Sequence, residues 1–123
     1  MAKRKRRSTL PEPQSPPVIA GLIGPMRTVP AGIARPDYAA TGEPSTRASR
    51  AIRTADEIEA MRVAGRVAAE ALIEVGRHVR PGITHDELDR IGHEFMVAAG
   101  SYPSTLNYRG FPKSLCTSAN EIV

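Results

Sequence analysis

Two helix-start signals thirty residues apart most constrain what this chain can fold into. Thr54 is followed three residues later by Glu57, and Thr84 is followed at the same spacing by Glu87. In such a capping box the threonine hydroxyl accepts from the backbone N–H of the third residue, whose carboxylate accepts from the threonine N–H. A Pro-Gly pair at 81–82 ends the first helix. The sequence therefore predicts two helices joined by a tight turn.

Each predicted helix carries one apolar stripe at three-to-four-residue spacing. The stripes are Ile58, Met61, Ala64, Ala68, Leu72 and Val75 on the first helix, and Leu88, Ile91, Phe95 and Ala99 on the second, with Gly100 as the C-cap. The first stripe is rich in alanine, and small side chains permit close approach. We therefore expect the first helix to lie tightly against another element.

The helical pattern ends at Gly100, and residues 102–112 read as a loop with two aromatic-proline steps. Residues 114–118 then predict a strand, residues 119–121 a reversal, and Ile122 and Val123 the start of a returning strand. The expected fold class is α/β of the α+β kind: two helices, then the start of an antiparallel sheet. On this interpretation the chain stops inside an element.

Residues 1–53 differ from residues 54–123 in charge and proline content. The first segment holds ten Lys and Arg against three acids and eight of the eleven prolines, and the second holds seven against ten. We predict a disordered, basic, Pro-rich extension and linker at 1–53 and a folded body at 54–123. The run Lys3, Arg4, Lys5, Arg6 and Arg7 favours binding to polyanions. A solvated terminus without a specific partner is the alternative.

Several protein classes are excluded by composition. No apolar run approaches eighteen residues, and the chain has one cysteine, which argues against a membrane-spanning protein and a disulfide-stapled secreted domain. The apolar stretch 18–23 after the basic run is short and flanked by prolines, so it does not fit a signal peptide. We expect a cytoplasmic protein with no membrane partner.

Chemistry-bearing residues in the body form no complete catalytic set. His85, Asp89 and His93 recur every four residues, but histidines eight apart on a helix are separated by about 12 Å of rise, so we expect a solvated polar surface. Asp86, Glu87, Asp89 and Glu94 form an acidic cluster. Asp86 and Glu87 lie in the first turn of the second helix, where the helix dipole favours negative charge, so capping explains them. From its pattern alone, Cys116 is expected to be a buried strand residue.

Two stretches resemble the start of the catalytic domain of type I methionine aminopeptidases of the subclass with an N-terminal extension. They are EIEAMRVAGRVAAEALIEVGRHVRPGITHDELDRI at 57–91 and YPSTLNYRGFPKSLCTSANEIV at 102–123. The segment TVPAGIARPDY at 28–38 also resembles the linker of that subclass. The resemblance implies a pita-bread (creatinase/aminopeptidase-like) fold and hydrolytic removal of the initiator methionine from nascent polypeptide N-termini. It also implies two divalent metal ions, such as Co, Mn, Fe or Zn, in the complete domain.

The resemblance carries three positions over as the methionine side-chain pocket: Tyr108, Phe111 and Cys116. Aromatic walls and a polarizable thiol suit a thioether. Phe111 stands where some members have Tyr, and Thr105 where many have Pro. Neither difference argues against a pocket.

The family's metal ligands, two Asp, one His and two Glu, lie downstream of the matched stretch, as does the histidine that assists the substrate amide. The resemblance therefore assigns no metal ligand and no catalytic residue to this chain. We expect a truncated domain that is inactive alone, whose basic arm binds ribosomal RNA. A non-enzymatic ribosome- or RNA-tethering protein is the alternative, and the sequence leaves the oligomeric state open.

Overall fold

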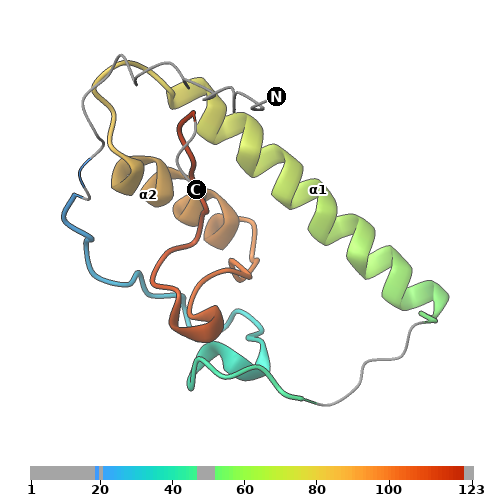
Figure 1. The fold of residues 1–123 in the computed structure, drawn as a ribbon. Helices are drawn as coiled ribbons and strands as arrows, with labels where there is room; N and C mark the ends of the chain where they lie inside the picture. The colour runs from blue at the N-terminus through green and yellow to red at the C-terminus, as the bar shows by residue number, and fades with distance from the viewer. Residues whose placement is uncertain (1–18, 20, 47–51, 121–123) are drawn as a thin grey trace, which may run out of the picture.

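The computed structural model describes residues 19, 21–46 and 52–120. Along the chain these form the 3-10 helix η1 (Asp37–Ala39), the long helix α1 (Ala55–His78), helix α2 (His85–Ala98) and the 3-10 helix η2 (Tyr108–Gly110) (Figure 1). The basic run at 3–7 and the predicted returning strand at 122–123 lie outside the described residues. No described helix has the length and apolar character needed to cross a membrane.

Both helices begin at the predicted threonines. At α1 the capping box is complete: the Thr54 N–H donates to Glu57 Oε2 at 2.7 Å, and the Glu57 N–H donates to Thr54 Oγ1 at 3.2 Å. At α2 the Thr84 hydroxyl accepts from the Glu87 N–H at 3.1 Å, but the Glu87 carboxylate pairs with Arg90 instead of returning to Thr84. The second predicted box is therefore half formed.

The two helices end as their sequences predict. Helix α1 stops at His78, before the Pro-Gly pair, and the turn that follows contains Gly82 at φ +87°. Gly100 adopts φ +72° beyond the end of α2, and its N–H donates to Val97 O at 2.9 Å. Only glycine takes such a positive φ at little cost. The predicted helical hairpin is confirmed.

The helices pack at one end of α1 only. Ala71 and Val75 of α1 are buried, as is Leu88 of α2. The prediction that the first helix lies tightly against another element holds only at this end of the helix, because Met61 is 62% exposed and Leu72 is 69% exposed. Figure 1 shows the N-terminal half of α1, drawn in green, extending away from the rest of the described chain.

The strand predicted at 114–118 is wrong, and no β-strand occurs among the described residues. The backbone there bonds to side chains instead of to a neighbouring strand. The N–H groups of Ser114 and Leu115 both donate to the carboxylate of Asp89, and the Ser114 carbonyl accepts from the Thr105 hydroxyl at 2.6 Å. The turn predicted after it contains Asn120, at φ 54°.

Residues 25–44, which we call the strap, pass beside α2 and reach the loop at 104–116 (Figure 1). Val29 of the strap is buried. Arg27 contacts α2, and Tyr38 contacts the loop through a hydrogen bond to Ser104 O at 2.6 Å. The strap therefore joins the two parts of the fold that follow it in sequence.

Candidate functional site

The 104–116 loop carries the three residues predicted for the methionine pocket. Tyr108 lies in η2 and is 42% exposed, Phe111 is 38% exposed, and the Cys116 thiol is exposed. The Phe111 N–H donates to Tyr108 O at 3.0 Å, and Phe111 O accepts from the Asn107 N–H at 2.8 Å. Two of the three side chains thus project from one tight backbone turn, while Cys116 lies five residues beyond it.

Exposure of Cys116 contradicts its predicted role as a buried strand residue. The pattern of small and apolar neighbours suggested a strand, and without the strand there is no sheet to cover the thiol. Its assignment to the methionine pocket, which came from the resemblance, is a separate prediction. An accessible thiol is available to a ligand, and a buried one is not.

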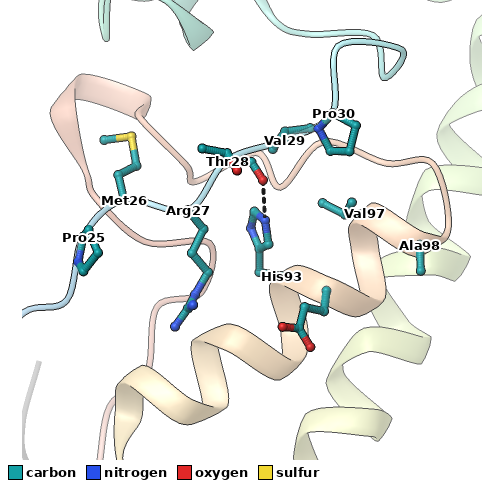
Figure 2. Close-up of a pocket in the computed structure, with 10 residues that line it drawn as sticks. Pro25, Met26, Arg27, Thr28, Val29, Pro30, His93, Val97 and Ala98 are labelled. Carbon is teal, nitrogen blue, oxygen red and sulfur yellow. Dashed lines mark hydrogen bonds between the residues drawn. The ribbon is translucent and has the colours of Figure 1, made fainter.

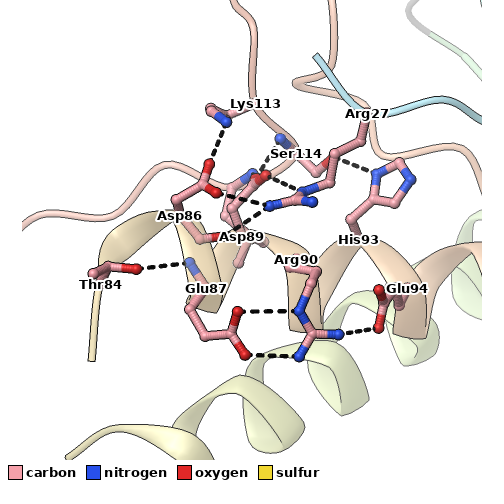
Figure 3. Close-up of polar contacts among 11 residues, drawn as sticks. Arg27, Thr84, Asp86, Glu87, Asp89, Arg90, His93, Glu94, Lys113 and Ser114 are labelled. Carbon is pink, nitrogen blue, oxygen red and sulfur yellow. Dashed lines mark hydrogen bonds and ion pairs between the residues drawn. The ribbon is translucent and has the colours of Figure 1, made fainter. Parts of the chain in front are cut away.

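One buried carboxylate holds the loop onto α2. Asp89 is 2% exposed, and its Oδ1 accepts from the Ser114 N–H at 2.7 Å and the Leu115 N–H at 3.0 Å. Its Oδ2 accepts from Arg27 Nε at 3.0 Å (Figure 3). Hydrogen bonds to an ionised acceptor are roughly twice as strong as neutral ones. Asp89 therefore ties the loop, the strap and α2 together at one point.

His93 makes a second link one helical turn later. It is 5% exposed, its Nε2–H donates to Thr28 O at 3.0 Å, and its Nδ1 lies 2.7 Å from Ser114 Oγ. A carbonyl oxygen can only accept, so Nε2 of His93 carries a proton, and Nδ1 is hydrogen-bonded to the Ser114 hydroxyl. Both side chains are buried and hydrogen-bonded, so the Ser114-His93 pair serves as a structural link between the loop, the strap and α2.

The prediction of a solvated polar surface at His85, Asp89 and His93 is wrong for the last two. His85 is exposed and contacts Thr117, whereas Asp89 and His93 are covered by the strap and the loop. The prediction failed because the partners of Asp89 and His93 are remote in sequence: backbone groups, the Ser114 hydroxyl and Arg27. The four-residue spacing of Asp89 and His93 on one side of α2 was the available signal.

The first turn of α2 carries Asp86 and Glu87, as the capping argument predicts. Asp86 also binds Lys113 and Arg27, and Glu87 binds Arg90 (Figure 3). The hydrogen bond from Lys113, together with the charges of Lys113 and Arg27, holds the pKa of Asp86 below its ordinary value despite some desolvation. Arg90 likewise lowers the pKa of Glu87.

An open hollow with a volume of about 670 Å³ lies between the strap and α2, and it is lined by residues 25–30 and by His93, Glu94, Val97 and Ala98. Figure 2 shows Met26 and Val97 beside it, with His93 reaching across to Thr28. The three predicted pocket residues are not among those that line it. This hollow is therefore separate from the loop surface of Tyr108 and Phe111.

The metal ions implied by the resemblance do not fit the acids that the structure describes around α2. The carboxylate oxygens of Asp89 already accept hydrogen bonds from two N–H groups and Arg27. Asp86, Glu87 and Glu94 each pair with a cationic side chain. Nowhere in residues 19, 21–46 and 52–120 do three His, Cys, Asp or Glu side chains gather in a way that could hold a metal ion. We derive no chemical step through a metal from these residues.

Comparison with known proteins gives the family. Residues 59–123 match metallopeptidase family M24. The chain is 54% identical over 105 residues to methionine aminopeptidase 2 of Mycobacterium tuberculosis (strain ATCC 25618 / H37Rv), a match that covers 84% of this chain and 36% of that protein.

Two further relatives are eukaryotic. The chain is 46% identical over 107 residues to mitochondrial methionine aminopeptidase 1D of Dictyostelium discoideum, covering 84% of this chain and 26% of that protein. It is 46% identical over 107 residues to methionine aminopeptidase 1 of Saccharomyces cerevisiae (strain ATCC 204508 / S288c), covering 82% and 28%. The chain thus spans between about a quarter and a third of the lengths of these relatives. The resemblance stated from the sequence is confirmed, and the chain belongs to metallopeptidase family M24.

Proposed function

We propose that this chain supplies the methionine-recognising part of a methionine aminopeptidase, an enzyme that hydrolyses the initiator methionine from nascent polypeptides. The relatives described above are all methionine aminopeptidases, and membership of family M24 implies the pita-bread fold. They give no support to the alternative of a non-enzymatic RNA-tethering protein.

One observation carries the proposal: the side chains assigned to the pocket are accessible, while the loop that bears them is fixed. Tyr108, Phe111 and Cys116 are exposed to solvent. Ser114 lies between Phe111 and Cys116 in the sequence, contacts α2 and is 4% exposed. Its N–H, hydroxyl and carbonyl groups all have partners. A surface that is already ordered before it binds a ligand loses less entropy on binding. Aromatic faces and a thiol are favourable neighbours for a thioether sulfur.

Amide hydrolysis in this family needs more than recognition. In the complete domain, two divalent ions would supply the Lewis-acid chemistry of amide hydrolysis. The acids around α2 are committed to cations and backbone N–H groups, so residues 1–123 by themselves are proposed to bind methionyl N-termini without cleaving them.

The single cysteine gives a site-specific test of recognition. The purified chain is alkylated with iodoacetamide in the presence of L-methioninamide or L-alaninamide, and modification of Cys116 is followed by mass spectrometry. We expect methioninamide to slow alkylation and alaninamide to have little effect, because only the longer side chain fills the pocket. Phe111→Ala should weaken the protection. Equal protection by both amides, or none, would contradict the proposal.

A cleavage assay tests the second half of the proposal. The chain is incubated with a Met-Ala-Ser peptide and Mn²⁺ or Co²⁺, and released methionine is measured. We expect no release above the metal-only control. Substantial turnover by the pure chain would show that its own residues complete a metal site, against the fit described above.

The partners proposed are nascent polypeptide N-termini and, through the basic run at 3–7, ribosomal RNA. Five adjacent cations bind phosphates with an affinity that falls steeply as salt rises. Cosedimentation with ribosomes should therefore decrease between low and physiological salt and disappear when residues 1–10 are deleted. Binding that is insensitive to salt, or that survives the deletion, would rule out this role of the run.

A further inference from the structure

Tyr38 of the strap contacts the 104–116 loop next to Tyr108, the first of the three proposed pocket residues. The Tyr38 hydroxyl donates to Ser104 O at 2.6 Å. The Tyr38 ring meets the Tyr108 ring edge to face, with centroids 5.2 Å apart and an interplanar angle of 87°. Burial, together with Tyr102, Asp37 and Tyr108 nearby, raises the pKa of the Tyr38 hydroxyl above its ordinary value of 10.0.

The strap also holds the backbone on both sides of Tyr108. Asn107 and Arg109 have φ of 60° and 51°, in the left-handed region that disfavours side chains with a Cβ. The Asn107 side-chain amide donates to Ala39 O at 3.1 Å, and the Arg109 N–H donates to Gly42 O at 2.8 Å. Two carbonyls of the strap thus stabilise two unfavourable conformations.

The contact at Gly42 leaves little room for a larger residue. Gly42 has φ +80°, and a Cβ at this position would lie 3.3 Å from the Gly110 nitrogen. Backbone strain that persists must be enforced by surrounding contacts, and it is often found at functional sites. Here the enforcing contacts come from residues more than 60 positions earlier in the sequence.

We propose that residues 38–42 of the strap are a positioning element of the methionine pocket, in which Tyr38 sets the orientation of Tyr108 and thereby the preference for a methionine side chain. This inference rests on the proposed function. Tyr38 is a positioning residue, because it acts through the ring of Tyr108. The segment preceding the M24-matched residues 59–123 would then contribute directly to substrate selectivity.

The geometry predicts that removal of Tyr38 weakens recognition of methionine. Tyr108 is 42% exposed, and its ring contacts the Tyr38 ring edge to face. Without that contact the ring has more rotamers available and must be ordered when a ligand binds. Aromatic pairs of this kind are worth about two- to tenfold in an equilibrium constant.

The test compares three variants of the full chain in the Cys116 protection assay. Tyr38→Ala removes both the ring and the hydroxyl, and we expect methioninamide protection to weaken about three- to tenfold, with a smaller preference over alaninamide. Tyr38→Phe keeps the ring and should recover most of the wild-type affinity. Tyr102→Phe is the matched control, because Tyr102 also donates to a loop carbonyl, Leu106 O at 2.9 Å, but has no ring contact with Tyr108 in the described contacts.

A measurement without ligand accompanies the assay. We expect amide hydrogen exchange at Arg109 to accelerate in Tyr38→Ala and to stay at the wild-type rate in Tyr102→Phe. If Tyr38→Ala does not fold, Tyr38→Leu retains apolar volume while removing the ring and is used in its place. Wild-type protection or wild-type exchange at Arg109 in Tyr38→Ala, or in Tyr38→Leu where it is used instead, would overturn the inference and leave the proposed function intact. Absence of methioninamide protection in the wild-type chain would instead defeat the proposed function, and this inference with it.

Discussion

At the residue scale, Asp89 joins three parts of the fold through one carboxylate. Its two oxygens accept hydrogen bonds from Ser114, Leu115 and Arg27. Each of these partners would lose a charged acceptor if the carboxylate were removed. Leaving buried partners unsatisfied costs more than the net gain of making the bonds. The stability of the loop should therefore depend on Asp89 far more than on the exposed acids of the same helix.

Asp89→Ala tests this dependence. We expect a loss of about 3 to 5 kcal/mol in the free energy of unfolding, because one partner of a buried ion pair is removed. Glu94→Ala is the matched control on the same helix: Glu94 is 60% exposed where it pairs with Arg90, and its loss should cost about 1 kcal/mol or less. Urea unfolding followed by circular dichroism measures both. Equal losses in the two variants would contradict the assigned role of Asp89.

The lowered pKa of Asp86 predicts a pH effect with a definite sign. Its folded pKa lies below the ordinary value of 3.8, so its ion pairs add stability above the unfolded pKa, and that stability is lost as pH falls through the folded pKa. Lys113→Met removes the largest cause and should raise the folded pKa toward 3.8. Carboxyl ¹³C shifts followed by NMR against pH give the midpoint. An unchanged midpoint in the variant would show that Lys113 is not the cause.

At the element scale, the two helices differ in what holds them. Helix α2 is covered by α1, the strap and the loop, whereas the first turns of α1 rely on the capping box at Thr54 and on helix propensity. Helices without tertiary cover are marginal in water. The N-terminal half of α1 should therefore respond to its cap more than α2 responds to its own.

Thr54→Ala should consequently accelerate amide exchange in the first turns of α1, because an N-cap threonine stabilises a helix by about 1 kcal/mol. Exchange in α2 should not change. In Thr84→Ala the effect should be smaller, since buried contacts at Leu88 and Asp89 hold the first turns of α2 independently of the cap. Similar exchange profiles for the two variants would contradict this difference between the helices.

The helices could be predicted from the sequence because their signals are local. Capping residues, periodic stripes and a glycine stop each act within a few positions, and α1 and α2 begin and end where these signals lie. The loop could not be predicted in the same way. Ser114 and Leu115 look like strand residues, but their N–H groups bind Asp89, a partner 25 residues away that no periodicity identifies. The same long-range contacts buried Asp89 and His93 and left Cys116 uncovered.

At the scale of the whole molecule, the strap is what connects the sequence-local parts into a site. Arg27 and Thr28 reach α2, and Tyr38 and Gly42 reach the 104–116 loop. The predicted division at residue 53 rested on charge and proline content, which do not report contacts. The fold and the proposed pocket therefore depend on residues on both sides of that division.

The most direct test of the account is an NMR titration of the chain with L-methioninamide, with L-alaninamide as the control. We expect methioninamide to shift the amide and side-chain signals of Tyr108, Phe111 and Cys116, with smaller shifts at Tyr38 and none along the first half of α1, while alaninamide shifts none of them appreciably. Shifts spread over the exposed stripe of α1, or identical responses to the two amides, would contradict the claim that the 104–116 loop recognises methionine.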